Sequence, residues 1–196
     1  KVMMGVERKS LQLTERERVV TAWHEAGHAV VAALLPNADP VHKVSIVPRG
    51  RAMGVTMQLP DTDRHTYTRD YLETQIAILM GGRAAEQLFL QIETSGASND
   101  IERATDIATH MVCTFGMSPL GPLAYRRQDE GSGGKAGFSD ETARKVDEEI
   151  RAIVTRGLDA AHRMLDERRD RVQAVAERLL EVETIDAEDI RELVNQ

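Results

Sequence analysis

The five residues His24-Glu25-Ala26-Gly27-His28 constrain the fold of this chain more than any other stretch. Residues four positions apart on a helix lie one turn apart on the same face, so both imidazoles can reach one metal ion if the segment is helical. Glu25 directly follows the first histidine and can point at a water beside the metal instead of at the metal itself. The spacing therefore predicts a hydrolytic zinc site carried by a helix.

The flanking residues favour a helix around both histidines. Thr14 and Glu17 form a capping-box pattern at its start, and Pro36-Asn37 ends the segment. Gly27 lies between the histidines, where a small residue would let another segment approach closely. Apolar residues recur at helical spacing, at Val19, Val20, Trp23, Ala26, Val30, Val31 and Leu34.

Composition excludes several classes of partner. A net charge of -7 and a pI near 5.4 argue against nucleic acid or an anionic membrane surface as the main partner. Cys113 is the only cysteine, which excludes an intrachain disulfide and a thiolate zinc cluster and favours a reducing compartment. No apolar run approaches the roughly 20 residues of a membrane span, so we expect this segment itself to be soluble.

The first two thirds of the chain predict a helical domain with a short strand pair. Residues 41–47 and 53–59 are rich in β-branched and apolar side chains and flank a turn at 48–51. Residues 68–90 show helical spacing interrupted by Gly81-Gly82, which predicts either two helices or one helix with close packing at the glycines. A loop at 94–98 then precedes a helix over 99–115.

The last third is predicted to be helical after a mobile loop. Gly131-Ser132-Gly133-Gly134 predicts mobility, and Asp129 and Ala136 stand where a phosphate loop needs glycine and Ser or Thr. The expected fold class is therefore mainly α, with a small β-hairpin near the active site and a C-terminal helical bundle. Apolar stripes that predict core or subunit contacts are Ile150, Val154, Leu158, Ala161 and Leu165, then Val172, Val175, Leu179 and Leu180, with a last helix over 187–194.

A catalytic zinc usually has three protein ligands, so two histidines leave one ligand to find. The metzincin pattern would need a third histidine where Leu34 stands, which excludes that pattern. Asp100 and Glu86 are the acidic candidates. Asp100 could equally be an ordinary first-turn acid after an Asn99 cap. Remaining alternatives are a solvated Glu86 or its salt bridge with Arg83, and a ligand role for His42, His65 or His110.

Over nearly its whole length the chain resembles the peptidase domain of the FtsH-type ATP-dependent zinc metalloproteases, which are membrane-anchored AAA proteases. The segments that carry the resemblance are Glu7-Arg8-Lys9-Ser10, Thr21-Ala22-Trp23-His24-Glu25-Ala26-Gly27-His28-Ala29, Asp39-Pro40-Val41-His42-Lys43-Val44, Pro48-Arg49-Gly50-Arg51-Ala52, Gly54-Val55-Thr56, Gly81-Gly82-Arg83-Ala84-Ala85-Glu86, Ser95-Gly96-Ala97-Ser98-Asn99-Asp100, Met117-Ser118, Leu120-Gly121-Pro122-Leu123 and Ser139-Asp140-Glu141-Thr142-Ala143.

The resemblance implies a helical zinc-peptidase domain and specific residue roles. It makes Asp100 the third ligand of one Zn²⁺ per chain, beside His24 and His28, with Glu25 as the catalytic base. It gives Glu86 a supporting role that orients the site. It places Gly54, Val55 and Thr56 on an edge strand beside the zinc cleft, where an extended substrate could add as a β-strand.

The resemblance also implies what would surround this domain in a full-length protein. Residues 1–12 would be a linker from a missing upstream ATPase module, which alone would bind ATP and Mg²⁺. Residues 13–196 would be the peptidase domain, divided into a catalytic part at 13–116, a flexible loop region at 117–138 and a C-terminal helical part at 139–196.

The implied whole protein is a homo-hexamer that degrades unfolded, damaged or unassembled membrane proteins and some soluble proteins. Missing N-terminal helices would anchor it in a membrane with this domain on the cytoplasmic side. A bacterial inner membrane is expected, and a mitochondrial or chloroplast membrane is the alternative. The rival functions are a stand-alone zinc peptidase and a catalytically silent, metal-stabilised oligomerisation module.

Overall fold

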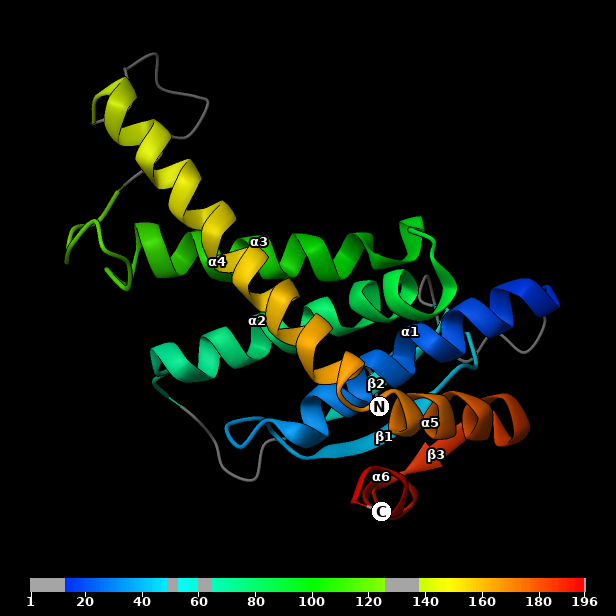
Figure 1. The fold of residues 1–196 in the computed structure, drawn as a ribbon. Helices are drawn as coiled ribbons and strands as arrows, with labels where there is room; N and C mark the ends of the chain where they lie inside the picture. The colour runs from blue at the N-terminus through cyan, green and yellow to red at the C-terminus, as the bar shows by residue number, and fades with distance from the viewer. Residues whose placement is uncertain (1–12, 49–52, 60–64, 126–137, 196) are drawn as a thin grey trace.

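The computed structural model describes residues 13–48, 53–59, 65–125 and 138–195, and over these residues the chain is mainly helical with one small sheet (Figure 1). The expected fold class is confirmed. The expected linker at 1–12, the turn residues 49–51 and the glycine-rich loop at 131–137 lie outside the described residues.

Helix α1 (Glu15–Leu34) begins at the expected capping box. The Thr14 hydroxyl accepts from the Glu17 backbone N–H at 3.3 Å, and the Glu17 carboxylate accepts from the Thr14 N–H at 2.8 Å. The helix ends before Pro36, as expected. Both histidines and Glu25 therefore lie in its middle, where the backbone is held by hydrogen bonds in both directions.

The sheet contains one strand more than expected. Strands β1 (Val41–Ser45) and β2 (Val55–Gln58) form the expected antiparallel pair, and β3 (Thr184–Asp186) pairs with the other side of β1. The order is β2-β1-β3, so β2 lies at an edge of the described sheet. The C-terminal segment thus completes the sheet next to α1.

Helix α2 (Arg69–Ala85) continues into a π-helical turn, η1 (Glu86–Leu90), and packs against α1. Of the two arrangements predicted for the glycine pair, one helix with close packing is found. An ideal Cβ built on Gly27 would lie 2.3 Å from the Gly81 carbonyl oxygen. The two helix backbones therefore touch at this point, because neither residue has a side chain to separate them.

Helix α3 begins one residue before the expected position. A short 3₁₀ turn, η2 (Ser95–Ala97), leads directly into α3 (Ser98–Cys113). The expected Asn99 cap is wrong, since Ala97 occupies the N-cap position and makes no side-chain capping bond. The Thr94 side chain instead accepts from the Gly96 N–H and organises the turn before the helix.

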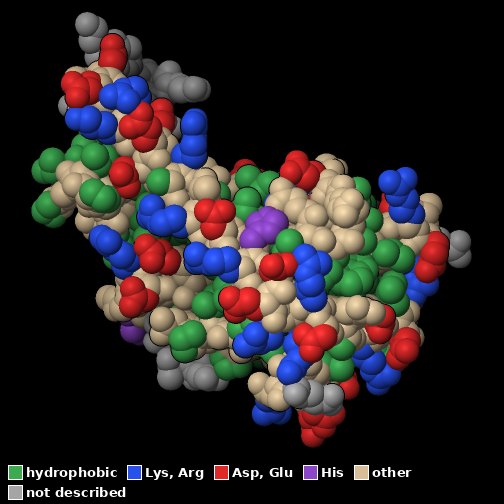
Figure 2. All heavy atoms as spheres, viewed as in Figure 1, with side chains coloured by type: hydrophobic (Ala, Val, Ile, Leu, Met, Phe, Trp, Pro, Cys, Tyr) green, Lys and Arg blue, Asp and Glu red, His purple; other side chains and the backbone are tan. Residues whose placement is uncertain are grey.

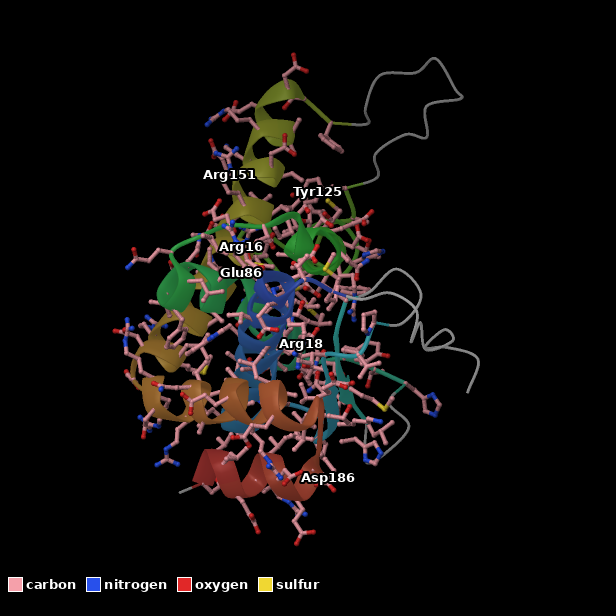
Figure 3. All side chains as sticks on the ribbon, turned by 90° about the vertical axis from the view of Figure 1, so that its right-hand side faces the viewer. Arg16, Arg18, Glu86, Tyr125, Arg151 and Asp186 are labelled. Carbon is pink, nitrogen blue, oxygen red and sulfur yellow. The ribbon has the colours of Figure 1, made fainter. Side chains whose placement is uncertain are left out.

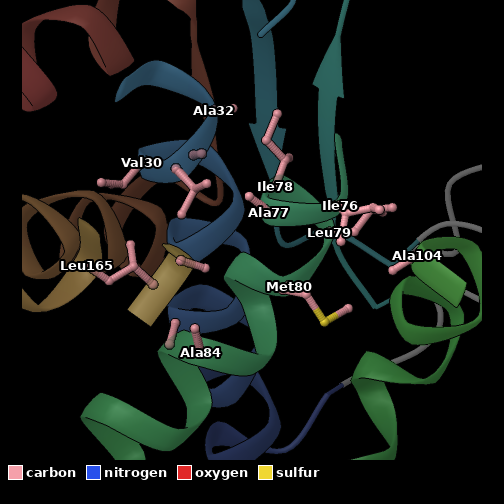
Figure 4. Packing of buried hydrophobic residues seen from close by; sticks show 14 of the residues in the cluster. Val30, Ala32, Ile76, Ala77, Ile78, Leu79, Met80, Ala84, Ala104 and Leu165 are labelled. Atoms are coloured by element: carbon pink, nitrogen blue, oxygen red, sulfur yellow. The ribbon is translucent and has the colours of Figure 1, made fainter. Parts of the chain in front are cut away.

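The C-terminal helices cover α1 and α2. Helix α4 (Asp140–Asp166) packs on α2 and extends its N-terminal half away from the body, while α5 (Arg169–Val182) packs on α1 and α6 (Ala187–Asn195) follows β3 (Figure 1). The expected stripes contribute to the core, with Ala161, Leu165, Val172, Val175 and Leu179 fully buried. Figure 4 shows Leu165, Val30 and Ala84 among the buried residues of the core, to which α4, α1 and α2 each contribute.

On the face drawn in Figure 2, basic and acidic side chains are interspersed and do not separate into a large basic or acidic patch. Within the described residues, no helix combines the length and apolar character that a membrane crossing requires. Cys113 is buried in the core.

We predict that Gly27→Ala destabilises the fold although alanine favours a helix by about 1 kcal/mol. The new methyl group would collide with backbone atoms of Gly81, which cannot rotate away as a side chain could. We expect the free energy of unfolding to fall by about 1 to 3 kcal/mol in urea titrations. Thr105→Ala, a change at an exposed position of α3, serves as the control. An unchanged or raised midpoint for Gly27→Ala would contradict the close contact.

Candidate metal centre

The site is assembled from three segments that are far apart in the sequence. His24 and His28 come from α1, Asp100 comes from the first turn of α3, and Glu86 begins η1. Glu86, labelled in Figure 3, is completely buried, and the two histidines are less than a tenth exposed. The structure therefore brings together residues that the sequence separates by up to 76 positions.

Three atoms converge on one point. His24 Nε2 lies 3.0 Å from His28 Nε2 and 3.2 Å from Asp100 Oδ2, and His28 Nε2 lies 3.3 Å from the same oxygen. One ligand atom from each of these residues falls within 4.8 Å of the others. The exposed His42, His65 and His110 are not part of this group.

The other ring nitrogens fix the tautomers. His24 Nδ1 donates to Glu86 Oε1 at 2.8 Å, and His28 Nδ1 donates to the Ile78 carbonyl at 2.7 Å. Both partners can only accept, so each Nδ1 carries its hydrogen, and in the neutral ring each Nε2 presents a lone pair. Lone pairs from two nitrogens and one carboxylate thus meet at a single point. Such an arrangement is repulsive unless a metal ion or a proton lies between them.

The donor set fits zinc. Two imidazole nitrogens and one carboxylate oxygen are the ligand types that catalytic zinc sites use, with a further position left for water. A hydrogen-bond acceptor behind each metal-facing histidine is the usual companion of such ligands, because it holds the ring and raises its basicity. The residues present therefore suit a zinc ion held by His24, His28 and Asp100.

Electrostatics in the metal-free protein agree with a cation site. Burial lowers the pKa of His24, but hydrogen bonds with Asp100 and Glu86 outweigh it and raise that pKa to about 9. Burial raises the pKa of Asp100, yet its interactions with the His24 and His28 rings bring it well below its usual range. A proton on His24 therefore supplies positive charge here at neutral pH, and zinc would displace it.

Glu25 points to the sheet instead of the ligand cluster. Its Oε2 accepts from the Thr56 hydroxyl at 2.7 Å, and an ideal Cβ on Gly54 would lie 2.5 Å from its Oε1. Burial raises the pKa of Glu25, and its interactions with His28, His24 and the Thr56 hydroxyl only partly oppose this shift. A buried carboxylate with a raised pKa is suited to accept and return a proton.

Glu86 links His24 to the segment that carries Asp100. Its Oε1 accepts from His24 Nδ1 and from the Thr94 hydroxyl at 3.0 Å, and its Oε2 accepts from the Thr94 N–H at 2.9 Å. Arg83 also lies 3.7 Å from Oε2, so the expected salt bridge is present, whereas a solvated Glu86 is excluded by its burial. Burial raises the pKa of Glu86, but hydrogen bonds from His24 and Thr94 lower it overall.

Sequence reasoning did not find three of these contacts. Thr94 and the Thr56 hydroxyl sit in ordinary loop and strand patterns that carry no special signal. The Ile78 carbonyl is a backbone group, which no residue type identifies. Each is recognised only from its distance to a site residue.

Comparison with known proteins supplies the family. The family model described as Peptidase family M41 matches residues 11–193. The chain belongs to peptidase family M41. Its M41 membership makes it a metallopeptidase, and zinc is the metal stated in the names of its relatives.

Several relatives of this M41 chain are about half identical to it in sequence. The "ATP-dependent zinc metalloprotease FtsH" of Acidobacterium capsulatum is 54% identical over 200 residues, which cover 99% of this chain and 31% of the relative. Proteins of the same name from Magnetococcus marinus and Cupriavidus metallidurans are each 52% identical, covering 99% of this chain and 30% and 31% of the relatives. The chain spans about a third of the length of these relatives.

We predict that Asp100→Ala abolishes stoichiometric zinc binding, while Glu86→Ala weakens zinc binding by about 10- to 100-fold. Asp100 supplies an atom to the converging group, whereas Glu86 only holds His24. Metal analysis after dialysis and competition with a zinc chelator measure both effects.

Glu102→Ala, an exposed change on the same helix as Asp100, is the matched control. Circular dichroism verifies that each variant is folded, and Glu86→Gln provides a second, isosteric variant if truncation disturbs the buried loop. A larger loss of zinc for Glu86→Ala than for Asp100→Ala in folded protein would reverse the two roles.

Proposed function

We propose that this chain is the zinc endopeptidase domain of an ATP-dependent, membrane-anchored protease that degrades polypeptides. The observation that carries the proposal is the convergence of His24 Nε2, His28 Nε2 and Asp100 Oδ2, with an acceptor behind each ring. Glu25 follows His24 in the chain, and the Thr56 hydroxyl holds its carboxylate toward β2, so it stays free to carry a proton instead of binding the metal.

In the proposed reaction His24, His28 and Asp100 hold the metal. Zinc, when bound, lowers the pKa of a water ligand toward about 7 and polarises the scissile carbonyl. Glu25 takes the proton of the attacking water and passes it to the leaving nitrogen. Glu86 keeps the His24 ring in place throughout. Cys113 is buried in the core and takes no part, so no covalent intermediate on sulfur is involved.

The substrate of the proposed peptidase is an extended polypeptide. Residues Gly54, Val55 and Thr56 lie at or next to β2, the edge strand adjoining Glu25. An extended chain can pair with such an edge through main-chain hydrogen bonds, which tolerate many side chains. The degraded proteins would be unfolded, damaged or unassembled membrane proteins and some soluble ones.

The ATP-dependent part of the proposal concerns residues outside this chain. The relatives are named ATP-dependent, and about two thirds of each lies beyond the matched region. An upstream ATPase module would bind ATP and Mg²⁺ and thread polypeptide into the zinc site. By resemblance to the FtsH-type proteases, the full-length protein is a homo-hexamer anchored by N-terminal helices, with this domain on the cytoplasmic side of the membrane.

Two other functions are compatible with a metal-binding helical domain. A stand-alone zinc peptidase would lack ATP coupling. Finding an ATPase sequence directly before Lys1 in the parent protein would eliminate this alternative. A catalytically silent oligomerisation module would bind zinc only for stability. The buried, raised-pKa Glu25 favours catalysis over that module, because a purely structural zinc needs no base.

We predict that Glu25→Gln retains fold and zinc but loses cleavage of unfolded casein by at least about 100-fold, because the amide cannot carry the proton. Fluorescent casein measures cleavage, and metal analysis measures zinc. Glu102→Gln, the same change at an exposed position of α3, is expected to match the parent chain. Undiminished cleavage by zinc-loaded Glu25→Gln would eliminate Glu25 as the base.

A further inference from the structure

Thr56 makes a hydrogen bond that joins the sheet to the base. Its hydroxyl donates to Glu25 Oε2 at 2.7 Å and lies 3.3 Å from the Glu25 backbone carbonyl. Glu25 is only 6% exposed, so few other donors can reach this oxygen. A charge-assisted hydrogen bond in a buried place fixes the direction of a carboxylate more firmly than one in water does.

Gly54 leaves space for the other carboxylate oxygen. An ideal Cβ at this position would lie 2.5 Å from Glu25 Oε1 and 2.7 Å from its Cγ. A side chain here would therefore displace the carboxylate. Thr56 and Gly54, two positions apart on one strand face, act on the two oxygens in different ways: one by donating and one by leaving room.

The backbone N–H and C=O of Thr56 point away from β1. Leu59 N–H donates to the Pro40 carbonyl, so Leu59 and, by alternation, Met57 and Val55 direct their backbone groups toward β1. On the central strand, Ile46 N–H donates to Glu183 on the β3 side. Val44 lies two residues before Ile46, so its backbone groups also point toward β3. Val44 and Thr56 therefore form a pair without backbone hydrogen bonds between them. Both observations direct the N–H and C=O of Thr56 to the outer edge of β2.

We propose that Thr56 is the positioning residue for the base Glu25, fixing the carboxylate through its hydroxyl while its backbone faces the outer edge of β2, where an extended polypeptide would pair. This inference rests on the proposed peptidase function. Thr56 would contact both the bound peptide, through its backbone, and the Glu25 carboxylate, through its hydroxyl. The separation of base and scissile bond is then set by one residue, and misplacement by about 1 Å can cost about 100-fold in rate.

The experiment compares Thr56→Val with Thr56→Ser. Valine matches threonine in shape and strand preference but lacks the donor, whereas serine keeps the donor and lacks the methyl group. For Thr56→Val we expect kcat on an unfolded peptide to fall by about tenfold or more, with KM and zinc affinity within about twofold of the parent chain. Thr56→Ser is expected to stay within about threefold of the parent kcat.

The control removes a comparable hydroxyl elsewhere. Thr105 donates to the Ile101 carbonyl at an exposed position of α3, so Thr105→Val is expected to leave kcat, KM and zinc affinity unchanged. Gly54→Ala is a second perturbation that keeps the Thr56 donor but fills the space beside Oε1. It is expected to lower kcat as well, and it decides the question if Thr56→Val fails to fold.

Crystal structures give a readout independent of activity. In Thr56→Val we expect the Glu25 carboxylate to rotate away from β2, and in Thr56→Ser we expect Oε2 to stay within about 3 Å of the introduced hydroxyl. An unmoved carboxylate with parental kcat in Thr56→Val overturns the proposal, as does a Thr56→Ser variant as impaired as Thr56→Val. If the zinc-loaded parent chain cleaves nothing, the proposed function fails, and the carboxylate positions alone still decide the role of Thr56.

Discussion

The contact between α1 and α2 at Gly27 and Gly81 is the constraint on which the site depends. With the two backbones touching, the Ile78 carbonyl comes within reach of His28 and Glu86 comes within reach of His24. Gly82 adds a second requirement, because a Cβ there would lie 2.4 Å from the His24 ring. Wider spacing of these helices would remove both acceptors and leave the histidines free to rotate, so helix packing sets metal-site geometry.

The same neighbours give three buried or half-buried carboxylates different chemistry. Asp100 and Glu86 receive hydrogen bonds from histidines, which lower the pKa of each and keep it charged. Glu25 faces β2, accepts from the Thr56 hydroxyl, and keeps a pKa raised by burial. Environments that separate the pKa values of neighbouring acids also separate their roles. The charged carboxylates of Asp100 and Glu86 are suited to a site that holds a cation, and Glu25 is suited to carry a proton.

Local signals predicted much of the fold, whereas long-range contacts were beyond the sequence. The Thr14 capping box and the strand pair were predicted, because each depends on residue types within a short window. At Gly27 the sequence indicated only that a close approach is sterically possible, and it did not identify Gly81 as the partner. Strand β3 was missed, since three residues between two helices carry no periodicity. The residues alone left the third ligand open between Asp100 and Glu86, because spacing along a chain does not give distance in space. The fold now places Asp100 at the converging atoms and Glu86 behind His24.

Anomalous diffraction at the zinc edge, from crystals grown with zinc, tests the central claim most directly. The account predicts one anomalous peak about 2.0 to 2.2 Å from His24 Nε2, His28 Nε2 and an Asp100 carboxylate oxygen. Glu86 should still accept from His24 Nδ1, and Glu25 should remain off the metal. A peak ligated by Glu86 or Glu25 in place of Asp100, or located away from α1, would contradict the account.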